Sequence, residues 1–426
     1  MGADITTTNW RETMKLKRLA LAACIAPCFV QPAMAQASEG SVQVYGKLYP
    51  YILTQTGSGA TTAGTPVSTL QAAATGVNNL DTNNGISSGN SRIGLRGERN
   101  TGGGLKASFQ LEGVVQVDNG SNEGKNFNFN RDNYVGLEGG FGAFKYGNLE
   151  TIQKTYGDTL SFLGVSSGTF MSTSNILRRP GFGTKSDSRF HERFANSIQY
   201  ETPSMAGVVV GLQYAIPGTT NEQEDSYATA KRKKVMSAGV KYDMGPIYLS
   251  MAHEIHYDFF GASNNTPGAL SNTGNAASNS TDSATQFSVE YRISKEHKIG
   301  FDAIRKYYSE TNGAAGRFDT YQNMAYQLAF ESRLTEKVRL AGSYVRSDAG
   351  SCTRVGGTSC DTSGLEGSKY TLGVGYDLDS KTRLFAAASL LHQGTSASYQ
   401  VVDIGSAKAS VGEDIQQFAV GLAYSF

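Results

Sequence analysis

The chain ends in QQFAVGLAYSF, residues 416–426, and its last residue is an aromatic one. Apolar side chains occupy every second position of this stretch: Phe418, Val420, Leu422, Tyr424 and Phe426. The residues between them are small or polar, and this period of two is typical of a β-strand with two unlike faces. The stretch therefore raises the question of which medium its apolar face meets.

The N-terminus carries the pattern of a secretory signal. Residues 14–35, MKLKRLALAACIAPCFVQPAMA, begin with basic residues, continue with an apolar run over 19–30 and end in an A-x-A cleavage motif. The alternative, a transmembrane helix, needs a longer apolar run. We therefore assign residues 1–35 to a leader and signal peptide, with Met14 as the initiator, and the mature chain to residues 36–426.

Charge and cysteine content narrow the class of protein. Removing the leader takes away four basic and two acidic residues and leaves 34 basic against 35 acidic residues. This near-neutral balance gives no reason to expect a nucleic-acid partner. Cys352 and Cys360 remain, with seven residues between them, and in an exported protein such a pair predicts a loop disulfide. Free thiols are the alternative, and a metal site is disfavoured because no His or second Cys pair lies nearby.

Apolar alternation recurs from residue 41 to the end in segments of roughly ten residues, the length of a membrane-spanning strand. In SVQVYGKL, residues 41–48, one face carries Val42 and Val44 and the other carries Gln43 and Lys47. Segments 105–112 and 287–293 repeat the pattern. A soluble β-sandwich also alternates, so the pattern alone leaves both architectures open.

The connections between these segments separate the two architectures. Short turns are expected at 100–104, 138–143, 202–206, 243–246, 294–297, 335–337 and 379–381. Long polar connections are expected at 56–90, 119–130, 150–193, 217–233, 259–282, 311–320, 349–367 and 394–413. Short and long connections alternate strictly and join sixteen strands, which predicts an all-β fold: a 16-stranded antiparallel transmembrane β-barrel with short periplasmic turns and long external loops.

Lipid then explains both the closed sheet and the terminal stretch. Backbone donors and acceptors cannot remain unpaired in hydrocarbon, so a sheet in a bilayer must join its own edges. The apolar row of the last strand would face acyl chains. Seven outward-phased aromatic residues near the short turns or the terminus form the expected periplasmic girdle: Phe144, Tyr242, Tyr291, Phe330, Tyr376, Tyr424 and Phe426.

Four stretches and the terminal aromatic residue carry a resemblance to a known family. They are SVQVYGKL at 41–48, SRIGLRGERNTGGGLKASFQLE at 91–112, NYVGLEGGFGAFKYGN at 133–148 and NSIQYETPSMAGVVVGLQY at 196–214. In strand order they resemble the trimeric general-diffusion porins of Gram-negative bacteria, of beta-proteobacterial and neisserial type. The resemblance implies a homotrimer and a third external loop folded into the pore. It also implies that the barrel-assembly machinery reads Tyr424 and Phe426.

A barrel of sixteen strands is wide enough to enclose an aqueous channel. The resemblance makes residues 150–193 the constriction loop, whose charged site residues are Lys154, Arg178, Arg179, Lys185, Arg189 and Arg193 against Glu150, Asp158, Asp187 and Glu192. Inward-phased cations on the facing wall are Lys47, Arg92, Arg96, Lys106 and Lys145. Lys47 departs from the acidic or small residue of many relatives, which leaves the charge preference open.

We expect passive diffusion of ions and small hydrophilic solutes, filtered by size at the loop. Basic rings favour anions, so the transverse field between the wall cations and loop carboxylates such as Asp158 and Asp187 predicts weak anion preference. For each charge the alternative is a solvated residue without a role in selectivity. Arg189 and Arg193 could instead pin the loop to the wall.

An enzyme and a surface adhesin are the competing functions. The five His residues form no G-x-S-x-G or H-E-x-x-H pattern, and His253 and His256 would point to opposite faces of a strand. We therefore expect no catalytic site, cofactor or metal. The Asn/Ser/Thr/Gly-rich loops at 56–90 and 259–282 could bind host or phage, although any exposed loop has this composition. Protein that produces no ion conductance in a planar bilayer would favour the enzyme or the adhesin.

The expected partners are two further copies of the chain, outer-membrane lipid and lipopolysaccharide, the barrel-assembly machinery, and small hydrophilic solutes and ions. Three arginines stay unassigned, because a bulge near a strand end would invert their phase: Arg131, Arg305 and Arg346.

Overall fold

The computed structural model describes residues 40–74, 79–118, 127–158, 163, 169–183, 189–217, 233–259, 270, 279–399 and 409–426. The predicted signal peptide, with Met14, lies outside these residues. The described strands of the first half are β1 (Ser41–Leu48), β2 (Tyr51–Ser58), β3 (Asn83–Ser87), β4 (Arg92–Gly102), β5 (Leu105–Val115), β6 (Phe127–Asn128), β7 (Asn133–Gly139), β8 (Gly142–Glu150), β9 (Arg193–Glu201) and β10 (Val208–Ala215).

Two short helices follow β8 and the remaining strands complete the chain. The helices are α2 (Ile152–Gly157) and α3 (Ser174–Leu177). The strands are β11 (Lys234–Met244), β12 (Ile247–Tyr257), β13 (Asn279–Arg292), β14 (His297–Thr311), β15 (Phe318–Arg333), β16 (Val338–Ser347), β17 (Ser351–Arg354), β18 (Gly367–Asp377), β19 (Thr382–Gln393) and β20 (Asp414–Ser425).

Within the described ranges, these twenty segments form one antiparallel sheet of sixteen barrel strands. Four barrel strands are interrupted and so appear as two segments each: β1 with β2, β3 with β4, β6 with β7, and β16 with β17. The register shows the continuity, because Leu48 of β1 pairs with Tyr424 and Tyr51 of β2 pairs with Gly421 on the same partner strand. The predicted 16-stranded barrel is confirmed.

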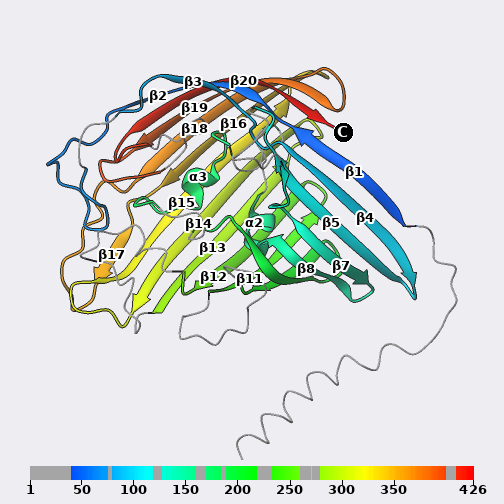
Figure 1. Cartoon of the computed structure of the whole chain (residues 1–426), viewed down its shortest axis with the longest axis horizontal. Helices are drawn as coiled ribbons and strands as arrows, with labels where there is room; N and C mark the ends of the chain where they lie inside the picture. The colour runs from blue at the N-terminus through cyan, green and yellow to red at the C-terminus, as the bar shows by residue number, and fades with distance from the viewer. Residues whose placement is uncertain are drawn as a thin grey trace, which may run out of the picture.

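The sheet closes between its last strand and its first. β20 pairs with β19 on one edge and with β1 and β2 on the other (Figure 1). At the seam, the N–H of Phe426 donates to the carbonyl of Gly46 at 3.1 Å, and the N–H of Gly46 returns a bond at 3.3 Å. A Cβ at Gly46 would lie 2.5 Å from the Phe426 ring, so only glycine leaves room for the terminal ring.

The two faces of the sheet differ as the alternation predicts. On β20 the outward side chains are exposed, from Phe418 at 53% to Phe426 at 38%, whereas inward Ala419 and Ala423 are buried. Outward Leu328 and Phe330 on β15 repeat the pattern. No helix in the described part of the chain is long and apolar enough to span a bilayer. Exposed apolar side chains of this kind lie on strands from β1 to β20, from Val42 to Tyr424, and give the barrel an apolar exterior.

Short connections lie at one end of the barrel, which we call the turn end, and long connections at the other, the loop end (Figure 1). All seven short turns fall where the sequence predicts. Several long connections are shorter than predicted: β2 runs to Ser58 and β3 lies within 56–90, β6 lies within 119–130, β13 begins at Asn279, β15 begins at Phe318, and residues 351–354 form β17. These strand ends are polar and extend beyond the apolar band, so their composition resembles that of a loop.

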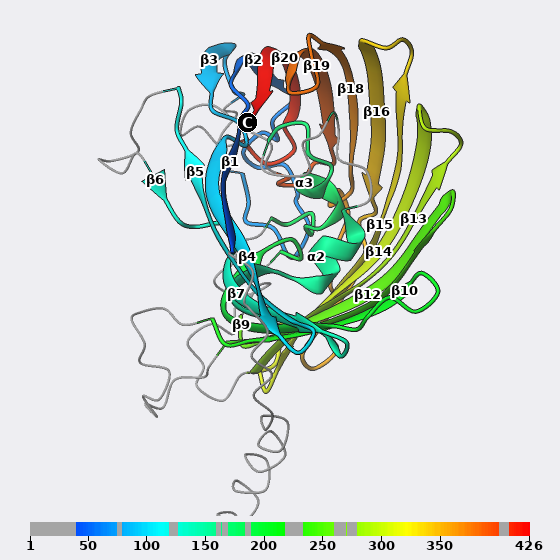
Figure 2. The same ribbon diagram turned by 90° about the vertical axis from the view of Figure 1, so that its right-hand side faces the viewer.

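Segments from the loop end fold into the barrel and build cores there. One core joins Phe182 and Phe190 of the 150–193 connection to Tyr308 on β14 and Tyr321 on β15. A second core joins Phe170 and Met171 to inward side chains of β2, β19 and β20. The interior of the barrel is thus partly filled by its own connections, with α2 and α3 inside the wall (Figure 2).

Candidate pore constriction

The connection between β8 and β9, residues 151–192, crosses the barrel interior. Its first helix, α2, lies against β10 to β13, and its second, α3, lies against β15, β16 and β18 (Figure 2). Thr151 caps α2 because its Oγ1 accepts the N–H of Lys154 at 3.2 Å. Phe170 and Met171 of the same loop pack against β2, β19 and β20, so the predicted constriction loop follows the wall from β10 round to β20 and β2. We call this side the covered wall and the side formed by β1 and by β4 to β8 the open wall.

Polar side chains of the covered wall hold α2 in place. The N–H of Gln153 donates to Ser237 Oγ at 3.0 Å. The carbonyl of Tyr156 accepts two bonds, from Tyr248 Oη at 2.7 Å and from Ser250 Oγ at 2.9 Å. Backbone groups at helix ends have no partner within the helix, so these bonds satisfy them without water.

An ion pair ties the middle of the loop to itself and to the wall. Arg178 is 1% exposed, and its Nη1 lies 2.9 Å from Asp158 Oδ1 while its Nε donates to Gln286 Oε1 on β13 at 3.0 Å. His191 Nε2 lies 3.1 Å from Asp158 Oδ1. Burial lowers the pKa of His191 to about 3, with Asp158 opposing the shift. A neutral His191 therefore donates its Nε2–H to an ionised Asp158 at neutral pH.

Two lysines of the covered wall bind the backbone of the second half of the loop. Lys306 on β14 is fully buried, and its Nζ donates to the carbonyls of Leu177 at 2.9 Å and Arg179 at 2.8 Å. Lys369 on β18 is fully buried as well, and its Nζ donates to the carbonyl of Ser172 at 3.0 Å. These ammonium groups meet carbonyl oxygens rather than pore water.

The start and the end of the loop are joined by charges at the rim of the open wall. Arg193, the first residue of β9, has Nε 2.7 Å from Asp132 Oδ1 and also pairs with Glu150. Lys154 Nζ lies 2.9 Å from the same Glu150 carboxylate. Arg193 therefore joins the ends of β8 and β9, between which the loop begins and ends, and Lys154 links α2 to the same carboxylate.

On the open wall, a buried carboxylate collects three partners. Glu112 on β5 accepts a hydrogen bond from Tyr45 Oη at 2.9 Å, lies 3.6 Å from Arg92 Nε and pairs with Arg131. Arg131, which the sequence left unassigned, thus faces the interior. One carboxylate shared by two guanidiniums leaves a net positive charge at this position.

Other cations of the open wall are bound less tightly. Arg96 bonds to Gln43 Oε1 at 2.9 Å and lies over the Tyr45 ring at 4.7 Å. Lys145 lies over the Tyr134 ring at 5.1 Å. Within the described residues neither cation forms an ion pair, although the Glu201 carboxylate interacts electrostatically with Lys145, and both direct their charge toward the lumen.

The remaining predicted site residues differ in what their charged groups contact. Lys106 pairs with Glu138 at 3.1 Å and with Glu98 at 3.5 Å, which offsets its charge. Lys47 lies over the Tyr49 ring at 4.8 Å, and Arg189 pairs with Glu192. The carbonyl of Arg179 accepts a hydrogen bond from Lys306 Nζ. Lys185 and Asp187 lie outside the described residues. The structure thus brings the wall cations together but pairs Asp158 within the loop.

Sequence reasoning missed Lys306, Lys369, Glu112 and Gln286 as site residues. Their signal was present, because each occupies an inward position of an alternating strand. Inward phase alone does not say whether an interior segment covers the side chain.

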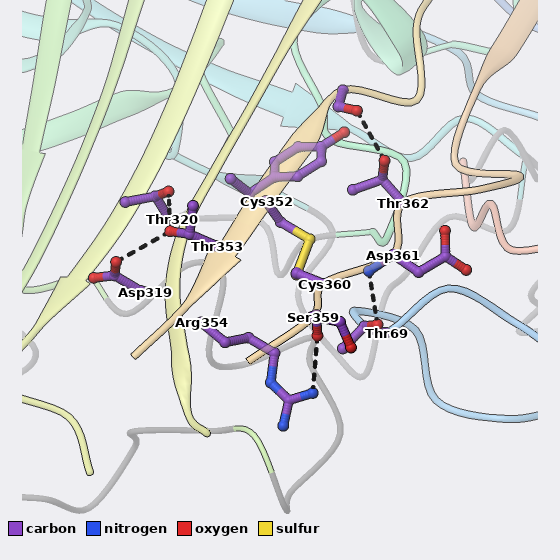
Figure 3. Close-up of a disulfide and its surroundings, with 12 residues drawn as sticks. Thr69, Asp319, Thr320, Cys352, Thr353, Arg354, Ser359, Cys360, Asp361 and Thr362 are labelled. Atoms are coloured by element: carbon purple, nitrogen blue, oxygen red, sulfur yellow. Dashed lines mark hydrogen bonds between the residues drawn. A yellow bond between two sulfur atoms is a disulfide. The ribbon is translucent and has the colours of Figure 1, made fainter. Parts of the chain in front are cut away.

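Cys352 and Cys360 are joined in a disulfide at the loop end, as Figure 3 shows. The neighbouring Asp361 exchanges two bonds with Thr69 in the connection between β2 and β3: its N–H donates to Thr69 Oγ1 at 2.9 Å, and its carbonyl accepts the Thr69 N–H at 2.8 Å. The segment beside the disulfide is therefore bonded to the connection between β2 and β3.

Relatives of known character agree with this geometry. A model of the Gram-negative porin family matches residues 20–396. An outer membrane porin protein of Bordetella pertussis is 29% identical over 187 residues, which cover 43% of this chain and 45% of that protein. Outer membrane porin protein 32 of Delftia acidovorans is 36% identical over 165 residues, 38% of this chain and 43% of that protein. The matched segments thus span less than half the length of these relatives.

Solved structures share the fold over nearly the whole chain. An anion-selective porin from Comamonas acidovorans superposes with a TM-score of 0.65 at 21% identity, covering 91% of this chain and 100% of that one. OmpT of Vibrio cholerae gives a TM-score of 0.57 at 18% identity, covering 92% and 100%. With an apolar exterior, a charged interior and a family match over most of its length, the chain belongs to the Gram-negative porins and is a protein of the outer membrane.

Proposed function

We propose that the protein forms a water-filled channel through which ions and small hydrophilic solutes diffuse passively. The carrying observation is the contrast between the two walls of the lumen. The loop with α2 and α3 is bonded to the covered wall, so the free path runs beside Arg92, Arg96 and Lys145 on the open wall. Passage would then be limited by size where the loop narrows the lumen.

Weak anion preference follows from the same wall. Arg96 and Lys145 form no ion pair among the described residues, and Glu112 is outnumbered by Arg92 and Arg131. Rings of basic side chains attract anions into a pore. The Comamonas acidovorans protein with the same fold is described as anion-selective, which supports this direction. Asp158 takes little part in the field, because Arg178 and His191 hold it inside the loop.

Swelling of liposomes in uncharged sugars tests the proposal. Purified protein reconstituted into liposomes should admit small sugars quickly and larger ones progressively more slowly. Swelling no faster than in protein-free liposomes would overturn the channel and favour the enzyme or adhesin alternative. A catalytic activity is no part of this proposal.

The assembly of the protein belongs to the proposal as well. We infer a homotrimer, a state recorded in the description of one OmpT structure with the same fold. The terminal Tyr424 and Phe426 would be the signal for the barrel-assembly machinery. Unheated electrophoresis should show a species of three times the unit mass, and deletion of Phe426 should reduce it.

Export fits residues 1–35 as a leader and signal peptide that starts at Met14. Cleavage after Ala35 would release a mature chain of residues 36–426, which forms one barrel domain. N-terminal sequencing of protein from the outer membrane tests this directly, since a first residue other than Gln36 would place the cleavage site elsewhere.

A further inference from the structure

Two of the arginines that the sequence left unassigned lie on the outside of the barrel. Arg305 on β14 and Arg346 on β16 are exposed, whereas the residues on either side of each one are buried. In β-strands, neighbouring side chains point to opposite faces. Since Lys306 points inward, Arg305 must point outward.

The two arginines flank one strand. Arg305 pairs with Met324 and Arg346 pairs with Tyr326, and these are consecutive outward residues of β15. Two strand spacings with an offset of two residues place the two Cα atoms about 12 Å apart. Both guanidiniums can therefore serve a single ligand lying over β15.

Their level matches the outer edge of the apolar band. Arg305 is eight residues beyond His297, the first residue of β14 at the turn end. Eight residues extend roughly 27 Å along a strand, or about 20 Å along the membrane normal at a tilt of about 40°, against an apolar band about 25 Å tall. The adjacent outward residues Thr285 and Gln322 are polar, while Phe301 and Leu328 below them are apolar.

Neither guanidinium has an acidic partner among the described residues. Arg305 Nη2 donates to Gln322 Oε1 at 2.6 Å, and Arg346 has no bonded partner there. Inward arginines behave differently, as Arg339 shows with its Nε 2.9 Å from Asp377 Oδ2. An unpaired cation at the edge of an apolar surface is a strong site for an anion, because little water is available to compete.

A shallow cavity of about 640 Å³ adjoins Arg305. Gln322, Met324, Asp348 and Ser351 help to line it. Asp348 carries the one carboxylate among the residues that line the cavity, and its Oδ1 already accepts the N–H of Met324 at 3.0 Å. The cavity therefore offers polar groups beside Arg305.

We propose that Arg305, Arg346 and Gln322 bind the phosphates of an outer-leaflet glycolipid of lipid A type, whose acyl chains lie over Phe301, Tyr326 and Leu328. Guanidinium groups recognise phosphate oxygens in bidentate fashion. Two phosphates at opposite ends of a disaccharide suit two separated guanidiniums better than the single phosphodiester of a phospholipid. This inference rests on the proposed channel's orientation, with the loop end outside the cell.

The test uses the folded, detergent-solubilised protein and native mass spectrometry with diphosphorylated lipid A as the probe. The variants are Arg305→Gln, Arg346→Gln and the double variant. Lys234→Gln is the matched control, because Lys234 is also an exposed cation at the loop end of its strand, β11. A cation near an anionic lipid surface contributes enough for about a fivefold change in affinity. Each arginine variant should therefore weaken binding about fivefold and the double variant about 25-fold, while Lys234→Gln stays within about twofold.

Further measurements distinguish the possible sources of phosphate, and separate a failure of the lipid site from a failure of the channel. Dephosphorylated lipid A should bind the wild-type protein weakly, and phosphatidylglycerol and inorganic phosphate should not show the arginine dependence. Equal losses for Lys234→Gln and the arginine variants would overturn the site, as would full arginine dependence with phosphatidylglycerol. Loss of the trimer in the double variant, with lipid A binding retained, would assign the face to subunit contact instead. Single-channel conductance of the same variants should stay unchanged, so a failed channel is distinguishable from a failed lipid site.

Discussion

The two walls of the lumen use the same kind of residue for different purposes. Lys306 and Lys369 on the covered wall are fully buried and direct their donors to loop carbonyls. Arg96 and Lys145 on the open wall lie over aromatic rings and keep their charge toward the lumen. All four occupy inward positions of amphipathic strands. The comparison teaches that a cation becomes a clamp or a filter according to what the loop covers.

Removing the clamp should have the largest effect on conduction. The double variant Lys306→Met, Lys369→Met leaves at least three buried carbonyls without their donors, each worth about 1–3 kcal/mol. The loop should detach in part, and single-channel records should become noisy with a larger mean conductance. Lys298→Met is the control, because Lys298 is an inward cation on β14 that pairs with Glu290 rather than with the loop. If the double variant gave current records as quiet as those of the wild type, Lys306 and Lys369 would not be holding the loop in place.

Removing the filter should change selectivity and leave the noise alone. A unit positive charge about 7 Å away in water attracts an anion and repels a cation by roughly 0.6 kcal/mol each. Salt at about 0.1 M halves both energies, so each lost cation should lower the anion-to-cation permeability ratio about threefold. Arg96→Ser and Lys145→Ser should both shift the reversal potential toward cations. Arg92→Ser should do so as well, because it also releases Glu112 from one partner. Unchanged reversal potentials would defeat the assignment of the open wall.

Acid should loosen the loop from the covered wall. The docked His191 has a pKa of about 3, below the value of about 6.5 of a free histidine. Its contribution to docking is therefore complete above pH 6.5 and is lost as the pH falls toward 3. Channel noise should rise over that window. In His191→Gln this component should be absent, so an identical pH profile for the variant would count against the assignment.

Reducing the disulfide should have the smallest effect on conduction. Closing a loop of about nine residues stabilises a fold by about 2.5 kcal/mol in the chain-entropy account. Cys352→Ser, Cys360→Ser should therefore lower thermal stability in detergent, measured by the loss of β-sheet circular dichroism. Its reversal potential should equal that of the wild type, since Asp361 beside the bridge bonds to Thr69 in the connection between β2 and β3 and none of the cations assigned to the open wall lies in the disulfide loop. A shifted potential would show that this connection reaches the ion path.

Much of the fold follows from the sequence, because strand phase and turn chemistry are local. The stretch from Phe418 to Phe426 predicts the lipid face of β20, and every short turn falls where predicted. The loop's course depends on long-range contacts that no local pattern encodes. Asp158 therefore looked like a free pore carboxylate, although Arg178 and His191 enclose it. Arg305 and Arg131 were ambiguous for a related reason, since only the register fixes their faces.

The central claim is that the barrel encloses a water-filled lumen whose open wall carries excess positive charge. Its most direct test is the reversal potential of single channels of the purified protein in a planar bilayer under a potassium chloride gradient. The account predicts discrete conductance steps and a reversal potential displaced toward that of chloride. A folded, inserted barrel that conducts no current, or one that reverses at the potassium potential, would contradict it.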